Sequence, residues 1–170
     1  GAMIRVGVEQ GLIKGEDVVS WGLRSPVPDA DELKWMRDNK HRYYGVAQLD
    51  REGYEAVAQK VFKDLKGKKL FISVDMDGIN PGEAPAVGSS AVGGPSVSQA
   101  ARMLRGLAMQ NEIVGAEFGE YNALLDDAHT TTGIAMDRLM RATLAGIAAR
   151  KLGITDPNYN APEALDDGVD

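Results

Sequence analysis

The residue types best suited to chemistry lie in Ser73-Val74-Asp75-Met76-Asp77, at the end of a strongly apolar run. Side chains alternate along a strand, so Asp75 and Asp77 are expected to point to the same side. Two carboxylates ending a buried strand repel each other and are costly to remove from water, and a pair of hard cations such as Mg²⁺ or Mn²⁺ would resolve that conflict. A structural role is the alternative, in which Asp77 caps the following turn and Asp75 accepts hydrogen bonds from local backbone amides.

Extended and helical patterns alternate around this motif. The sequence predicts strands at 18–22, 42–46, 70–74 and 113–118, and helices at 4–12, from Asp29, from Asp50 to 66, from Ser96 to 109 and from 131 to 151. The almost continuous apolar run at 70–74 is typical of a buried parallel strand. The alternation predicts an α/β fold with a mostly parallel sheet, in which functional groups gather beyond the carboxyl ends of the strands.

The composition excludes several classes of function. The 170 residues fit one domain and include no cysteine, which excludes disulfides, thiolate zinc sites and cysteine nucleophiles. The two histidines leave little for a histidine-rich metal site, and His41 is expected at a solvated helix end. A net charge of -6 argues against nucleic-acid or anionic-membrane partners, and no apolar run approaches the roughly 18 residues of a membrane span. We therefore expect a cytoplasmic protein.

The wider context of the motif resembles the ureohydrolase family, which includes arginases and agmatinases. After Ser73-x-Asp75-x-Asp77, the resemblance continues in Pro81, Ala84-Pro85 and Gly93-Gly94. It extends to flanking stretches at 9–13, 22–24, 31–36 and 114–122. The ending, from Thr131-Thr132-Gly133 to Asp156-Pro157, is most similar to the longer agmatinase-like members, some of which act on guanidine itself.

This resemblance implies a three-layer α/β fold and two divalent metal ions, usually manganese and sometimes nickel. The metals would activate a bridging water that attacks the carbon of a small guanidino substrate and releases urea and an amine. Position by position, Asp75 and Asp77 match the metal-ligating aspartates, and Glu120 matches the glutamate that binds the guanidinium.

The match to the family is incomplete. Relatives carry further metal ligands in an earlier half, in Gly-Gly-Asp-His and Asp-Ala-His-x-Asp motifs, and no such residues precede Asp75. Asp127-Ala128-His129 imitates the second motif but lacks its final aspartate, so we interpret His129 as a loop or helix N-terminal residue. Asn80 stands where relatives have a third aspartate, and Ala86 replaces a glycine. We expect the isolated chain to be inactive.

Three hypotheses account for such a chain. It is a component of a ureohydrolase completed by a partner chain, an inactive homologue acting as a binding or regulatory subunit, or a truncated fragment. We interpret residues 1–2 as a cloning remnant, 3–152 as a partial ureohydrolase-like domain and 153–170 as an acidic irregular tail.

Missing strands would leave unpaired edges and apolar surface, which predicts a homo-oligomer or a complex with a complementary ureohydrolase chain. The last helix is apolar on much of its circumference and is predicted to be buried.

Overall fold

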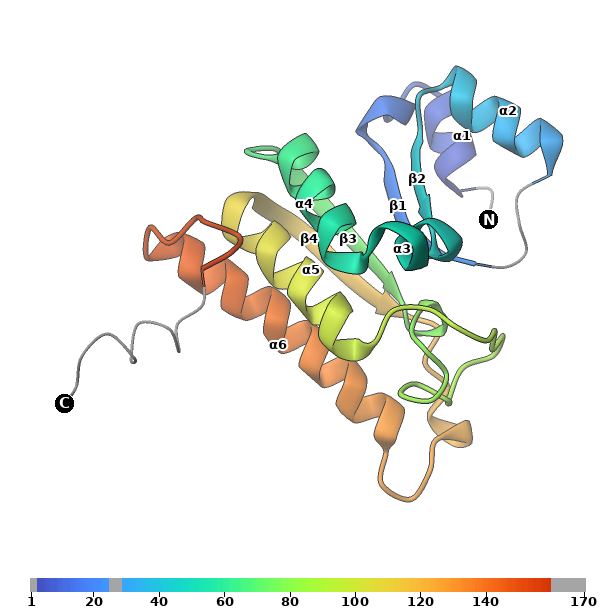
Figure 1. Cartoon of the computed structure of the whole chain (residues 1–170), viewed down its shortest axis with the longest axis vertical. Coiled ribbons are helices and arrows are strands. Elements are labelled where there is room, and N and C mark those ends of the chain that lie inside the picture. The colour runs from blue at the N-terminus through green and yellow to red at the C-terminus, as the bar shows by residue number, and fades with distance from the viewer. Residues whose placement is uncertain (1–2, 25–28, 160–170) are drawn as a thin grey trace.

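The computed structural model describes residues 3–24 and 29–159 (Figure 1). The elements are α1 (Met3–Glu9), β1 (Val19–Leu23), α2 (Ala30–Asp38), β2 (Arg42–Gly45), α3 (Val46–Glu52), α4 (Tyr54–Leu65), β3 (Lys69–Asp75), α5 (Val97–Gln110), β4 (Glu112–Gly119) and α6 (Thr131–Lys151). Short 3-10 turns are η1 (Gly15–Asp17), η2 (Met76–Gly78) and η3 (Ala123–Leu125). The predicted α/β fold is confirmed. Within the described ranges, no helix is long and apolar enough to cross a membrane.

The strands form two separate parallel pairs. In the first pair β1 lies beside β2, with Val19 opposite Arg42. In the second, β3 lies beside β4, with Asp75 opposite Gly119. Because β3 and β4 run in the same direction, the residues that follow Asp75 and Gly119 emerge at the same edge of the sheet.

Helices cover one face of the β3–β4 pair. In Figure 1, α5 lies between α4 and α6, in front of these two strands. The side chains of β3 alternate, so Ile72 faces the helices and is 8% exposed, whereas Phe71 on the other face is 63% exposed. The expectation that this run is a buried strand was therefore wrong for Phe71 and Ser73, because the part of the chain that the structure describes covers only one face.

The last helix is also less buried than predicted. Leu139 faces α5 and is fully buried, but Ile134 and Leu144 on the outer side are 62% and 64% exposed. The contact with α5 is close, because a Cβ at Gly146 would lie 2.5 Å from the carbonyl oxygen of Arg105. One stripe of α6 is packed, with Met136 and Ala142 partly buried beside it, and the outer side exposes apolar residues.

The predicted helix starts at Asp29, Ser96 and Thr131 are confirmed, and the one at Asp50 is wrong. Asp29 accepts a hydrogen bond from the backbone N–H of Glu32, and Ser96 forms a reciprocal capping box with Gln99. Asp50 instead lies inside α3. The chain breaks at Gly53, whose φ of 91° favours glycine, and α4 begins at the next residue.

The segment after α6 crosses α5. Arg102 donates a hydrogen bond to the carbonyl oxygen of Pro157 (2.9 Å), and Arg105 donates one to that of Tyr159 (2.8 Å). These contacts tie the beginning of the predicted tail to the helical layer. Residues 1–2 and 160–170 lie outside the described residues.

Candidate metal and substrate site

The three carboxylates singled out in the sequence lie at the carboxyl ends of β3 and β4. Asp75 ends β3 opposite Gly119, and a Cβ at Gly119 would lie 3.6 Å from the Asp75 Oδ1 atom. Glu120 follows Gly119 directly, and Asp77 lies in η2, two residues beyond Asp75. The parallel register of the two strands thus brings together residues that are about 45 positions apart in the sequence.

Asp75 and Glu120 lie close enough to Asp77 to affect its charge. Partial burial raises the pKa of the Asp77 carboxyl above its ordinary value, and the negative charges of Asp75 and Glu120 raise it further. The nearby guanidinium of Arg24 opposes these effects. Three acidic groups therefore share a site in which a cation would relieve their repulsion.

Among the described residues, the side chains of Asp75 and Asp77 accept no local hydrogen bond. Asp75 precedes η2 but its side chain accepts no capping hydrogen bond. The pKa of Asp77 is shifted by burial and by charges alone, with no hydrogen-bond donor contributing. Between residues 3–24 and 29–159 the structure thus gives no support to the capping alternative, and both carboxylates are available to a ligand.

The backbone around Glu120 is held in an unusual conformation. Glu120 has φ of 62°, in the left-handed region that non-glycine residues rarely adopt. The next residue is anchored twice, because Tyr121 forms a bridge with Val87 and its hydroxyl donates to Asp126 (3.0 Å). Strain of this kind is concentrated at functional sites, where surrounding contacts must sustain it.

The two positions at which the chain departs from the family motif are fully engaged in local structure. The side-chain oxygen of Asn80 accepts a hydrogen bond from the N–H of Gly82 (2.9 Å). Ala86 is buried, and its φ does not lie in the left-handed region. Its backbone N–H donates to the hydroxyl of Thr132, and its carbonyl oxygen accepts from the backbone N–H of Asn122. Alanine is therefore accommodated here without backbone strain.

The histidines take no part in this site. His129 lies in the loop before α6, as interpreted from the sequence, and its backbone N–H donates to Asp127 (2.9 Å). The expectation for His41 was wrong, because its ring is half-buried and its Nε2 lies 2.9 Å from the hydroxyl of Ser20 on β1. Pairing of β1 with β2 brings that ring inward, which an apparent helix end flanked by Lys40 and Arg42 did not reveal.

Carboxylate oxygens are the donors that Mn²⁺ and Mg²⁺ prefer, so Asp75 and Asp77 fit part of a metal site. They do not complete one. In the described part of the chain, no group of three or more histidine, aspartate or glutamate side chains is placed to hold a metal ion. A tightly bound pair of ions needs further ligands.

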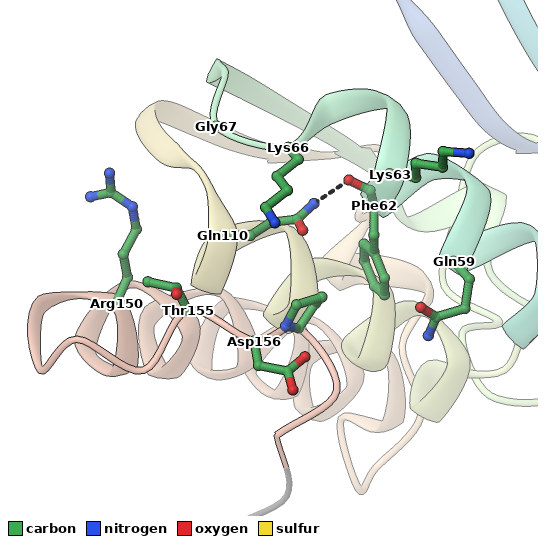
Figure 2. A pocket seen from close by; sticks show the side chains of 10 residues that line it. Gln59, Phe62, Lys63, Lys66, Gly67, Gln110, Arg150, Thr155 and Asp156 are labelled. Carbon is green, nitrogen blue, oxygen red and sulfur yellow. Dashed lines mark hydrogen bonds between the residues drawn. The ribbon is translucent and has the colours of Figure 1, made fainter.

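A cleft of about 810 Å³ lies at the opposite end of the β3–β4 pair (Figure 2). It is lined by the ends of α4, α5 and α6 and by residues after α6: Gln59, Phe62, Lys63, Lys66, Gly67, Gln110, Arg150, Thr155, Asp156 and Pro157. The amide of Gln110 is occupied by a hydrogen bond to the carbonyl oxygen of Phe62 (2.7 Å). None of the three site carboxylates lines this cleft, which is close to the starts of the strands rather than to their carboxyl ends.

Comparison with known proteins agrees with the resemblance found in the sequence. The model of the arginase family matches residues 1–146. An arginase of Bacillus caldovelox is 32% identical over 137 residues, which are 79% of this chain and 45% of that relative. Proclavaminate amidino hydrolase from Streptomyces clavuligerus has a similar structure, with a TM-score of 0.76 and 25% identity over 86% of this chain and 48% of that one.

A structure of Trypanosoma cruzi formiminoglutamase with Mn²⁺ has the same fold, with a TM-score of 0.75 and 20% identity over 86% of this chain and half of that one. The chain thus spans about half the length of the relatives it matches. From the parallel strand pairs, the carboxylates at their carboxyl ends and these matches, we conclude that the chain belongs to the arginase family.

Proposed function

We propose that this chain is one component of a two-metal ureohydrolase that cleaves a C–N bond of a small guanidino compound. Asp75 and Asp77 would hold the metal ions, manganese in the first instance and nickel as the alternative, and Glu120 would bind the cationic guanidinium. The remaining metal ligands would come from polypeptide outside this sequence. The observation that carries the proposal is the convergence of three carboxylates at one sheet edge, where burial and then the charges of the other two raise the pKa of Asp77.

Each residue has a separate chemical task. When bound, the metal ions supply hydroxide near neutral pH for attack on the guanidinium carbon. Glu120 is exposed and follows Gly119, the residue opposite Asp75 in the sheet. Its carboxylate would pair with the guanidinium of the substrate through two parallel hydrogen bonds. The fixed backbone at Tyr121 would keep that carboxylate in place. Release of urea and an amine follows from this arrangement.

The proposal also accounts for the exposed apolar surface. Parallel strands are normally covered on both faces, but the second face of β3–β4 leaves Phe71 and Val114 largely exposed. The outer edges of both strand pairs are also unpaired within the described residues. A complementary ureohydrolase chain or a second copy of this chain would cover these features.

Purification of the tagged chain from its source cells, followed by native mass spectrometry with metals retained, tests the proposal. We expect a co-purifying polypeptide, about two metal ions per complex and release of urea from a panel of guanidino compounds. The double variant Asp75→Asn/Asp77→Asn should assemble normally but lose metal and urea release. Full activity of the lone chain, or a complex without metal and urea release, would contradict it.

A second candidate function is that of an inactive homologue that binds or regulates a complete ureohydrolase. Asn80 favours it, because an amide stands where relatives carry an aspartate and is engaged with Gly82. This hypothesis predicts a metal-free assembly of this chain with an intact relative and a changed rate of that relative. An unchanged rate without complex formation would rule it out.

A further inference from the structure

Arg24 connects the two strand pairs at their carboxyl ends. It follows β1, and its guanidinium reaches both the beginning of the loop between β3 and α5 and a later part of that loop at Ala91. It donates to the carbonyl oxygens of Asp77 (2.5 Å), Gly78 (2.8 Å), Ile79 (3.2 Å) and Ala91 (3.0 Å). One side chain thus satisfies carbonyl groups that lie more than fifty residues further along the chain.

The cradle for this guanidinium is built from backbone. Gly94 has φ of 99°, and a Cβ there would lie 2.8 Å from Nη1 of Arg24 and 3.0 Å from the carbonyl oxygen of Gly78. Any side chain at position 94 would therefore displace the guanidinium from Gly78. The planar fork of arginine presents five N–H donors, whereas a lysine ammonium is a compact point charge that cannot reach both parts of the loop in this way.

From this geometry we infer that Arg24 is a positioning residue for the carboxylate site. Through Arg24, the β1–β2 pair keeps the loop after β3 in a fixed conformation. Its hydrogen bonds end on the carbonyl of Asp77 and on the next two residues, so it holds the backbone that carries the Asp77 carboxylate. The carboxylate itself remains available. This inference rests on the proposed function, because a metal ion at Asp75 and Asp77 is part of that proposal.

Two possible roles of Arg24 predict opposite effects on a cation. If it acted only through its charge, removing that charge would strengthen binding of Mn²⁺ to the nearby carboxylates. If it positions the loop, removal weakens binding, because the two aspartates lose their fixed separation. Loss of such outer supports typically costs about tenfold or more in metal affinity.

The test uses the whole chain, Mn²⁺ as the probe, and the variants Arg24→Met, Arg24→Lys and Arg42→Met. Arg42 is the matched control, since it is a half-buried arginine that is bound to Asp64 (3.1 Å) and to the carbonyl oxygen of Glu16 (2.9 Å), outside the carboxylate site. Metal-free amide hydrogen exchange of residues 76–95 reports loop order, and electron paramagnetic resonance of free Mn²⁺ reports affinity.

We expect Arg24→Met to speed exchange of residues 76–95 by about tenfold while α5 and α6 are unchanged. Mn²⁺ affinity should fall about tenfold in Arg24→Met and less in Arg24→Lys, with no change in Arg42→Met. Unchanged exchange in Arg24→Met, or tighter Mn²⁺ binding, would overturn the inference. Mn²⁺ binding by wild type that is lost in Asp75→Asn/Asp77→Asn would assign the metal to these two residues. If wild type binds no Mn²⁺, the proposed function is tested in the complex with the partner, and the exchange of residues 76–95 alone decides whether Arg24 positions the loop.

Discussion

The two strand pairs are stabilised in different ways. In β3–β4, Ile72 is buried against α5 and α6, and Val74 and Phe118 pack against the same cluster. In β1 and β2 the buried residues are the glycines Gly22 and Gly45, and the other side chains are half-buried or exposed.

The β1–β2 pair also contains buried polar groups that have no hydrogen-bond partner among the described residues. These are Nε1 of Trp21 in β1 and Nδ1 of His41, which directly precedes β2. Such groups cost stability, which indicates that β1–β2 is the weaker unit and depends on its attachments. The buried core consists of two clusters that meet at α5, one with β3–β4 and α6 and one with α3 and α4, and β1–β2 contributes only half-buried side chains to them.

The largest expected effect contrasts one apolar residue from each pair. Ile72→Ala removes a side chain that is 8% exposed and leaves a cavity, so we expect a loss of about 3 kcal/mol in the free energy of unfolding. Val19→Ala in β1 should cost only about 1 kcal/mol, because Val19 is half-buried. Urea denaturation of both variants measures the difference. Equal losses would show that the two pairs form one cooperative unit of uniform packing.

The next largest effect concerns the backbone conformation of Glu120, directly after β4. Glu120 has φ of 62°, and a side chain in that region costs about 1 kcal/mol relative to glycine. Glu120→Gly should therefore be about 1 kcal/mol more stable than Glu120→Ala, although both lack the carboxylate. Thermal unfolding of the two variants isolates the backbone strain from the charge. Similar stabilities would mean that the loop relaxes when the carboxylate is removed.

The weaker pair should respond to acid through His41. Burial lowers the pKa of His41 below its ordinary value, so the folded state disfavours the protonated ring. Above about pH 6.5 the ring is neutral in both states and this contribution to stability is complete. As the pH falls below that value the unfolded chain binds the proton first, and stability is lost until the pH passes the folded pKa.

The size of this loss is limited because the ring is only half-buried, and we expect about 0.5 kcal/mol. His41→Gln, which keeps a partner for Ser20, should lack this part of the pH dependence. Denaturation at pH 7.5 and pH 5 checks it. Parallel curves for wild type and variant would show that protonation of His41 is not coupled to folding.

The sequence predicted the strands and most of the helices because these depend on local patterns, but it missed the break at Gly53 that separates α3 from α4. Alternating runs placed all four strands, and the resemblance placed Asp75, Asp77 and Glu120 at strand ends that the register does bring together. Which face of a strand is covered depends on elements elsewhere in the fold, so the exposure of Phe71 was not predicted. Arg24 was missed as a functional residue for the same reason, since its partners are backbone carbonyls whose position only the folded chain reveals.

The smallest expected effect concerns the cost of the site itself. Burial and the neighbouring acids raise the pKa of Asp77, so the folded state holds its proton more tightly than the unfolded state does. Stability therefore falls as the pH rises from the ordinary value near 3.8 through the folded pKa, and the penalty remains above it.

Asp77→Asn should remove that penalty and raise stability at pH 7 by about 0.3 kcal/mol, an effect that disappears at acidic pH. Glu117→Gln is the control, because Glu117 lies on the exposed face of β4 and accepts from Ser73 (2.8 Å). Thermal unfolding at several pH values measures the stability of both variants. Added Mn²⁺ should make wild type more stable than Asp77→Asn, because wild type keeps both aspartates and Asp77→Asn does not. A destabilised Asp77→Asn at pH 7 would mean that Asp77 supports the fold of the β3–β4 pair rather than burdening it.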